Sequence, residues 1–425
     1  MGGGSAVNSE HELATERIAV DGPSRLRAVV LGSADVSREL VIALQRLGAE
    51  VVAVDRYVDG PLHGLADRSL AIDLSDGDEL AATIRWLQPK AVLIASDLVA
   101  LDALEAAIDP ACTELVPGVR GARLAVDAEG LHRLAADHLG LPVAPFWFAG
   151  SAGELRAIAE HGGYPMVVKP VIGALGEGRS VLVRAADVEP AWQRAVSALG
   201  PGTATPRVLA ETVVEVDSEV TLLAVHRNGS SGPALDFCAP IGHRSVDESN
   251  GRLTVEYWQP HPMSAVALDS ARSIAARVAR ALGGRGLFGV ELLIHGDEVY
   301  FAGISVRPYD AALLTTRTQR LSAFELQARA MLGLTTDTIG LSPGAARLIY
   351  SRRRTGADTA PVIASDTAPV LAEALTVPES DVVIFNHHEG HPRRRLGVAL
   401  ATGSDVAMAR HRAAQASAVL DKLWP

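Results

Sequence analysis

The stretch GYPMVVKPVIGALGEGRSVLV, residues 163–183, marks a change of pattern along the chain. A short apolar strand ends in Lys169, and a glycine-rich loop over residues 173–178 follows before the next strand. A lysine in this position can neutralise phosphate oxygens while backbone N–H groups bind the remaining ones. Only three of the 39 basic residues are lysines, so arginine would be the more common choice at the surface. The stretch predicts a phosphate-binding hairpin; a surface lysine before an ordinary hairpin is the alternative.

The preceding part of the chain has a different pattern. RLRAVVLGSADVSRELVIALQRLGAEVVAVDRY, residues 25–57, predicts a buried strand at 28–31, an amphipathic helix at 37–47 and a strand at 50–55. Such a βαβ unit indicates a parallel sheet. The first turn retains only one glycine of the dinucleotide fingerprint, which disfavours a nicotinamide dehydrogenase. An ordinary tight turn, or one that lines a pocket for another ligand, stays open.

After residue 183 the strands are separated by glycine-rich turns, which favours antiparallel pairing. NGSSG, residues 228–232, is a hairpin signal, and residues 288–305 read as a second hairpin with its turn at HGD. Helices are predicted over 268–282 and from near Ser322. The small-residue-rich stretch 355–374 predicts a loop or a weak strand.

Several charged residues in this part could carry chemistry. Glu211 ends a strand and Glu219 follows eight residues later, so they could accept hydrogen bonds from an adenine amine and a ribose hydroxyl, although acidic strand ends are usually just solvated. Glu291 has apolar neighbours, so its ionised form needs a partner or a metal. Arg307 and Asp310 follow the second hairpin in SVRPYD. The arginine triplet 393–395 is either a solvated turn or a phosphate clamp.

The composition narrows the function classes. The 425 residues carry a formal net charge of −11, which disfavours a nucleic-acid surface. Two cysteines 126 positions apart support neither a disulfide framework nor a zinc site. No run of about 20 apolar residues predicts a membrane-spanning helix. Residues 1–24 lack the order of a signal peptide, and we expect a mobile leader and a cytoplasmic protein.

Taken in order, these segments resemble the ATP-grasp superfamily and, within it, formate-dependent phosphoribosylglycinamide formyltransferase. The resembling stretches include GYPMVVKP, DFCAPIGHR, SVRPYD and RRRLGVALAT, and together they run from about residue 27 to residue 420. The resemblance implies an α/β protein of three domains: an N-terminal parallel αβ domain (25–130), an ATP-grasp domain (131–335) and a small C-terminal domain (336–425).

The resemblance also implies an ATP-dependent ligase of purine biosynthesis, a homodimer without nucleic-acid or membrane partners. ATP and Mg²⁺ would activate formate as formyl phosphate, which the amine of glycinamide ribonucleotide then attacks. The implied ATP contacts are Lys169, Gly173, Gly176, Gly178, Glu211, Val213, Val214 and Glu219. Glu291 would bind the metal. Arg307 and Asp310 are the implied catalytic residues, and the implied ribonucleotide contacts are Asp35, Val36, Asp310, His387, Arg394 and Arg395.

The chain departs from the family pattern at some of these sites. Gly303 stands where a second magnesium carboxylate is expected, Glu177 replaces a loop lysine, and Ala128 replaces an arginine. Ala95, Tyr309 and His387 alter the expected ribonucleotide pocket. Three hypotheses therefore stay open: the parent formyl transfer, a diverged homologue that binds a ligand or partner without this reaction, and a ligase for a different carboxylate and amine.

Overall fold

The computed structural model describes residues 26–32, 34–57, 60–172, 178–199, 205–229, 232–247, 253–351, 367–385 and 395–424. The expected leader lies outside these ranges. Six residues discussed above also lie outside them: Gly173, Gly176, Glu177, His387, Arg393 and Arg394.

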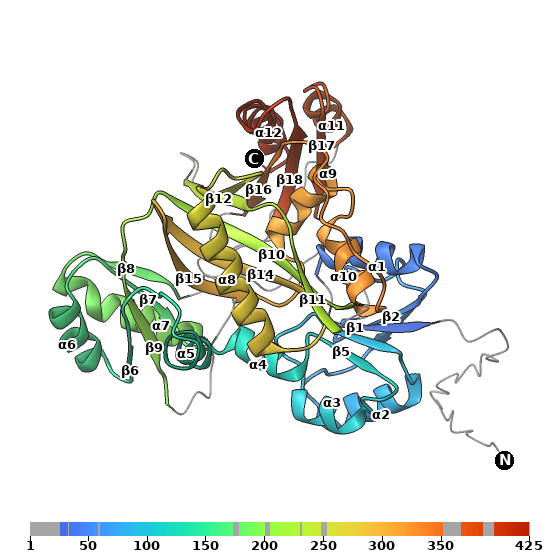
Figure 1. The fold of residues 1–425 in the computed structure, drawn as a ribbon, viewed down its shortest axis with the longest axis horizontal. Coiled ribbons are helices and arrows are strands. Elements are labelled where there is room, and N and C mark those ends of the chain that lie inside the picture. The colour runs from blue at the N-terminus through green and yellow to red at the C-terminus, as the bar shows by residue number, and fades with distance from the viewer. Residues whose placement is uncertain are drawn as a thin grey trace, which may run out of the picture.

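The N-terminal part is a five-stranded parallel sheet in the order β3-β2-β1-β4-β5, as the βαβ pattern predicted (Figure 1). After Arg27 its central strand is apolar and buried through to Leu31, which is typical of a parallel sheet covered by helices. The strands are β1 (Arg27–Leu31), β2 (Glu50–Asp55), β3 (Arg68–Ala71), β4 (Ala91–Ile94) and β5 (Glu114–Val116). The helices are α1 (Ser37–Arg46), α2 (Gly77–Leu87) and α3 (Leu101–Ala107).

A helical segment leads from this sheet to a small antiparallel sheet in the order β6-β9-β7-β8. The connecting helices are α4 (Val119–Val126), α5 (Ala128–Arg133) and the π-helix η1 (Leu134–His138). The strands are β6 (Phe146–Ala149), β7 (Met166–Pro170), β8 (Ser180–Leu182) and β9 (Val208–Thr212). Helices α6 (Ala152–Gly162) and α7 (Val188–Ala198), with the short η2 (Ala185–Asp187), pack against it, and the apolar side chains between them form a separate core.

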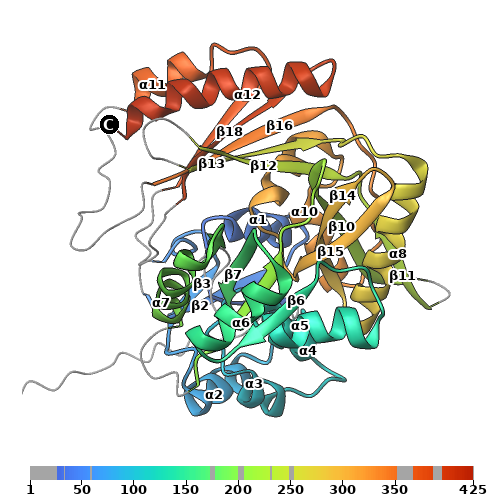
Figure 2. The same cartoon turned by 90° about the vertical axis from the view of Figure 1, so that its left-hand side faces the viewer.

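A nine-stranded sheet forms the rest of the molecule, in the order β15-β14-β10-β12-β13-β16-β18-β17 with β11 paired to β10. Its strands are β10 (Ser218–Gly229), β11 (Gly232–Phe237), β12 (Ile241–Asp247), β13 (Leu253–Gln259), β14 (Gly286–His295), β15 (Glu298–Ser305), β16 (Gly344–Tyr350), β17 (Ser380–Ile384) and β18 (Arg395–Thr402). The associated helices are α8 (Ala265–Leu282), η3 (Asp310–Leu314), α9 (Thr315–Thr318), α10 (Ala323–Met331), α11 (Ala368–Ala374), α12 (Val406–Leu420) and η4 (Asp421–Leu423). In Figure 2, α12 lies along β16 and β18.

The C-terminal strands belong to this large sheet because β13 pairs with β16 over six residue pairs. The predicted domain boundary at residues 335–336 lies in the connection between α10 and β16. The backbone hydrogen-bonding ladder therefore runs from the predicted ATP-grasp domain into the predicted C-terminal domain. The domain limits themselves stay a prediction.

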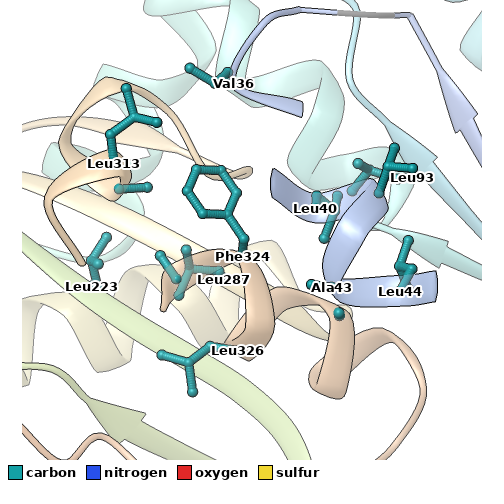
Figure 3. Packing of buried hydrophobic residues seen from close by; sticks show 14 of the residues in the cluster. Val36, Leu40, Ala43, Leu44, Leu93, Leu223, Leu287, Leu313, Phe324 and Leu326 are labelled. Atoms are coloured by element: carbon teal, nitrogen blue, oxygen red, sulfur yellow. The ribbon is translucent and has the colours of Figure 1, made fainter. Parts of the chain in front are cut away.

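One core joins the N-terminal sheet to the large sheet. Helices α1 and α10 pack against each other, and the ring of Phe324 lies between side chains of both parts (Figure 3). Phe324 is 1% exposed, and Leu40, Leu44 and Leu287 are buried in the same cluster. This apolar contact fixes the position of the N-terminal sheet against the hairpin that carries Glu291.

Most of the predicted elements are confirmed, and one prediction is wrong. The strand at 50–55 matches β2, and the two predicted hairpins form as β10–β11 and β14–β15. Helix α8 begins three residues before the predicted start because Ser264 caps it, with its hydroxyl accepting from the Ala267 N–H. The end of the 355–374 stretch is a helix, α11, rather than a loop or strand. Pro369 lies in its first turn, where a missing N–H costs no intrahelical bond.

Candidate active site

Lys169 and Glu211 form the first part of the site. They lie on the paired strands β7 and β9, and the Lys169 Nζ is 2.8 Å from the Glu211 Oε2. The other carboxylate oxygen lies 2.8 Å from the His132 Nε2, and the His132 Nδ1 lies 2.7 Å from the Ala128 carbonyl oxygen. A neutral imidazole has one donor and one acceptor nitrogen, whereas here both face acceptors. His132 therefore bridges the Glu211 carboxylate and the backbone of α5.

These contacts outweigh the cost of burying the Glu211 carboxylate. Burial alone would raise its pKa, but hydrogen bonding from His132 and the charge of Lys169 lower it from 4.5 to about 2. Glu211 is thus ionised at neutral pH. An ammonium group has three N–H donors, and the ion pair uses one of them, so Lys169 retains donors for a phosphate oxygen.

A second group of side chains surrounds Glu291 on β14. The Tyr309 Oη lies 2.9 Å from the Thr221 Oγ1 and 3.4 Å from the Glu291 Oε1. The tyrosine ring lies over Gly289, where a Cβ atom would come within 2.7 Å of the ring. Burial raises the pKa of Glu291, while the charges of His243 and Lys169 lower it, so the two groups of side chains act on each other electrostatically.

Glu219 and Gly303 lie on the strands that flank β14. The Glu219 carboxylate is 3.4 Å from the His243 Nδ1, and its charge acts on Glu291. Gly303 lies directly opposite Glu291 in the β14–β15 ladder and contributes no ligand. Within the described residues, no group of three or more His, Cys, Asp and Glu side chains could hold a metal ion.

The donor set around Glu291 fits Mg²⁺ only as a shared ion. The carboxylate is largely removed from water and has a single long hydrogen bond, so a cation would compensate its charge. Mg²⁺ in such sites keeps several waters and takes one or two carboxylates together with substrate phosphates. The residues present can supply one carboxylate to such a shell.

Asp310 connects the end of β15 with the C-terminal strands. It is 8% exposed, and its Oδ1 lies 2.6 Å from the Arg395 Nε on β18. The Tyr350 hydroxyl donates to its other oxygen. Burial and the Asp310 charge raise the pKa of Tyr350 well above its ordinary value, so it remains a donor at neutral pH. The negative charges of Asp310 and Glu291 both act on the buried Tyr257, which places these groups in one electrostatic neighbourhood.

Arg307 bonds to the N-terminal sheet instead. Its Nη2 lies 2.9 Å from the Asp97 Oδ1, in the segment after β4. The side chain remains 30% exposed. Parallel strands present their carboxyl ends at one edge, which is where ligands of such sheets commonly bind. Arg307 and Asp97 thus join this edge to the hairpin of Glu291.

The remaining predicted residues differ in how far their side chains can reach a ligand. Val36 is 6% exposed and packs into the shared core, so it can offer only its backbone (Figure 3). Asp35 lies on the same turn. Val213 is exposed, but its N–H donates to the Pro165 carbonyl, and Val214 follows it. Gly178 has a φ of +67°, and a Cβ atom there would collide with Ala198.

Sequence reasoning did not single out His132, Thr221 or His243. Each contacts a predicted site residue, but His132 and Glu211 are 79 positions apart and the Thr221–Tyr309 pair is 88 apart. No local pattern could signal these pairs. The only clue was a histidine in the DAEGLHR segment, which α5 places beside β9.

The fold and this arrangement of groups define an ATP-grasp protein. The ATP-grasp domain family matches residues 134–324, and the family described as PurT, C-terminal matches residues 369–420. The ADP complex of N5-carboxyaminoimidazole ribonucleotide synthetase is 18% identical, with a TM-score of 0.75 over 93% of this chain and 97% of that one. At this identity the likeness concerns the fold alone.

Similarity over nearly the whole chain identifies the family more narrowly. Formate-dependent phosphoribosylglycinamide formyltransferase of Corynebacterium efficiens is 43% identical, over 94% of this chain and 96% of that protein. The protein of the same name from Paraburkholderia xenovorans is 44% identical, over 93% of this chain and 95% of that protein. The solved structure of glycinamide-RNase-transformylase T from Mycobacterium tuberculosis is 50% identical in sequence, with a TM-score of 0.75. The match covers 92% of this chain and 99% of that one. The chain belongs to the family of formate-dependent phosphoribosylglycinamide formyltransferases.

No helix in the described residues combines the length and apolar character needed to cross a membrane.

Proposed function

We propose that this protein is an ATP- and Mg²⁺-dependent formyltransferase. In this reaction the γ-phosphate of ATP is transferred to formate to give formyl phosphate and ADP. The amine of glycinamide ribonucleotide then attacks the formyl carbon, and phosphate leaves. The observation that carries the proposal is the Lys169–Glu211 ion pair beside Glu291, in a chain similar over nearly its full length to enzymes of this name.

The chemistry of each described site residue suggests the part of the ligand that it would bind. Lys169 would bind a phosphate oxygen of ATP, and Gly178 is a further proposed ATP contact. Glu211, Val213, Val214 and Glu219 would hold the adenosine part. Glu291 would supply one carboxylate to Mg²⁺, which compensates phosphate charge when bound. Arg307 would bind an oxyanion, because a guanidinium matches carboxylate and phosphate geometry.

The ribonucleotide would bind between the N-terminal sheet and the C-terminal strands. The Asp35 and Val36 turn lies at the carboxyl edge of the parallel sheet, and Arg395 is held by Asp310 on the other side. A charge-assisted bond to Asp310 fixes the guanidinium of Arg395, and a fixed cation orients a bound phosphate at a smaller entropic cost. His387 and Arg394 complete the proposed ribonucleotide contacts. We further propose that the enzyme is a cytoplasmic homodimer.

The direct test measures ADP formation and N-formylation, with formate and glycinamide ribonucleotide omitted in turn. The proposal expects formylated product only when ATP, Mg²⁺, formate and the ribonucleotide are all present. Lys169→Met should lower kcat/KM on the order of 100-fold, because it removes a fixed cation from the transferred phosphate. Lys90→Met is the matched control, since Lys90 is exposed after α2 and should leave the rate unchanged. Absence of ATP binding would refute the proposal.

A second candidate function follows from Tyr309. Its ring occupies the space over Gly289, and its hydroxyl bonds to Thr221 and Glu291, so the residue that alters the expected ribonucleotide pocket also contacts the proposed metal carboxylate. This favours a ligase of the same mechanism for a different carboxylate and amine. ADP formation with a panel of small carboxylates and no formate would distinguish it. ATP binding without turnover on any of them would indicate a homologue that binds without catalysis.

A further inference from the structure

A cluster of arginines surrounds one buried carboxylate on the large sheet. Arg244, Glu256 and Arg347 lie directly opposite one another on the adjacent strands β12, β13 and β16. Residues paired in this way project to the same face, with Cβ atoms about 5 Å apart. Arg410 reaches the same carboxylate from α12, and its guanidinium stacks 4.2 Å above the ring of Trp258. We call these four charged residues the arginine cluster.

The hydrogen bonds in the arginine cluster are unevenly distributed. Glu256 Oε2 accepts from the Arg244 Nε at 2.8 Å and from the Arg410 Nη2 at 2.7 Å. The Arg347 Nη2 lies 3.6 Å from Oε1, too far for a hydrogen bond. The Arg347 Nε is buried and has no partner among the described residues. A guanidinium has five N–H donors and cannot lose its proton, so Arg347 retains unused donors.

The charges of the arginine cluster do not balance. The Glu256 carboxylate is 2% exposed and faces three guanidinium groups, so two positive charges lack a counter-ion within the cluster. Burial would raise the pKa of Glu256, but Arg410, Arg244 and Arg347 lower it, so the carboxylate stays ionised. Placing excess charge in a partly buried position is costly unless something compensates it.

The cluster is open to solvent and lies on the opposite face of the sheet from the candidate active site. The side chains of Arg244, Arg410 and Arg347 are 56%, 29% and 19% exposed. Successive strand residues point to opposite faces. His243, next to Arg244, bonds to Glu219, and Tyr257, next to Glu256, senses the charges of Asp310 and Glu291. A ligand of the arginine cluster would therefore not compete with ATP at Lys169.

We propose that the arginine cluster is a second anion-binding site that takes a phosphate-type oxyanion, either free or as the phosphate group of a small metabolite. Several guanidinium groups on one side of a site match the tetrahedral oxygens of phosphate by forked hydrogen bonds. Phosphate at neutral pH carries between one and two negative charges, which corresponds to the excess in the cluster. The proposal is independent of the reaction at Lys169.

The experiment measures the binding of inorganic phosphate by calorimetry, at constant ionic strength against chloride. The double variant Lys169→Met, Arg395→Gln removes the competing phosphate contacts proposed for ATP and for the ribonucleotide, and it serves as the background. In this background we expect one saturable site. Arg347→Gln should weaken it about tenfold or more, because it removes charged donors to the anion. The amide keeps a neutral polar side chain at this position, and circular dichroism verifies folding.

A matched variant distinguishes a ligand site from a purely structural network. Glu256→Gln removes the internal carboxylate that competes with the ligand, so it should tighten phosphate binding and increase the rise in Tm on adding phosphate. A structural network predicts the reverse: Glu256→Gln would lower Tm and phosphate would not restore it. Ribose 5-phosphate in place of phosphate separates a free-ion site from one for phosphorylated metabolites. Equal phosphate affinity in the Lys169→Met, Arg395→Gln background with and without Arg347→Gln, or no binding in either, would overturn the proposal.

Discussion

Gly303 lies directly opposite Glu291 in the β14–β15 ladder, and a Cβ atom on residue 303 would be 3.2 Å from the Glu291 Oε2. Position 303 is therefore the place on β15 from which a second carboxylate would reach the same ion as Glu291. Since glycine leaves this place without a side chain, the proposed magnesium shell depends on Glu291, phosphate and water.

Replacing Gly303 tests this relationship. Gly303→Glu should tighten Mg²⁺-dependent ATP binding about tenfold, because a second carboxylate adds charge and a ligand to the metal shell. Calorimetric titration of ATP at several Mg²⁺ concentrations measures the effect. Gly303→Ala adds the same Cβ atom without charge and should give no gain. If both variants behave alike, the residue opposite Glu291 does not contribute to metal binding.

Removal of the Glu291 charge should separate stability from binding. Burial raises the pKa of Glu291 above its ordinary value of 4.5. The folded protein therefore loses stability as the pH rises above 4.5 and this carboxylate ionises. Glu291→Gln should therefore raise the free energy of unfolding at neutral pH. The same variant should weaken Mg²⁺-dependent ATP binding. Urea denaturation without nucleotide and calorimetry with it measure the two effects. A destabilised Glu291→Gln would contradict the electrostatic account.

Ionisation of Glu211 should stabilise the folded protein, whereas ionisation of Glu291 should destabilise it. The pKa of Glu211 falls from 4.5 to about 2 in the folded protein, so its contribution is fully present above pH 4.5 and is lost as the pH falls towards 2. The contribution is about 3 kcal/mol. Wild type and Glu211→Gln should thus differ in unfolding free energy at neutral pH and converge only at about pH 2 and below. Urea denaturation of both proteins across this pH range measures the difference in unfolding free energy. If that difference does not change with pH, the ion pair is not its cause.

The shared core should be sensitive to loss of its central ring. Phe324 is 1% exposed between α1 and α10, so Phe324→Ala should cost about 3–5 kcal/mol of stability. Leu334→Ala, at a 42% exposed position after α10, is the control and should change stability by about 0.5 kcal/mol or less. Urea denaturation of both variants provides the comparison. Similar costs for the two would mean that the N-terminal sheet is not fixed by this contact.

The sequence predicted those parts of the molecule that depend on neighbouring residues. The periodicity of residues 50–55 and the turns of the two hairpins were sufficient because a strand or a tight turn is encoded within a few positions. Lys169 stood out for a similar reason: a rare residue type at a strand end, next to glycines, is a local signal. Residues 355–374 lack such a local signal. Their small side chains show no periodicity, so the sequence did not predict α11.

Which distant side chains meet depends on long-range packing and became visible in the three-dimensional structure. His132 reaches Glu211 across 79 residues, and Arg410 reaches Glu256 across 154, through strand register and helix packing that no short segment contains. The same holds for the sheet that continues from β13 into β16. The lysine that marked the fold was visible in the sequence. Its carboxylate partner, the glycine that faces Glu291 and the arginines around Glu256 were placed by long-range strand pairing, because pairing determines which residues lie opposite one another and on which face.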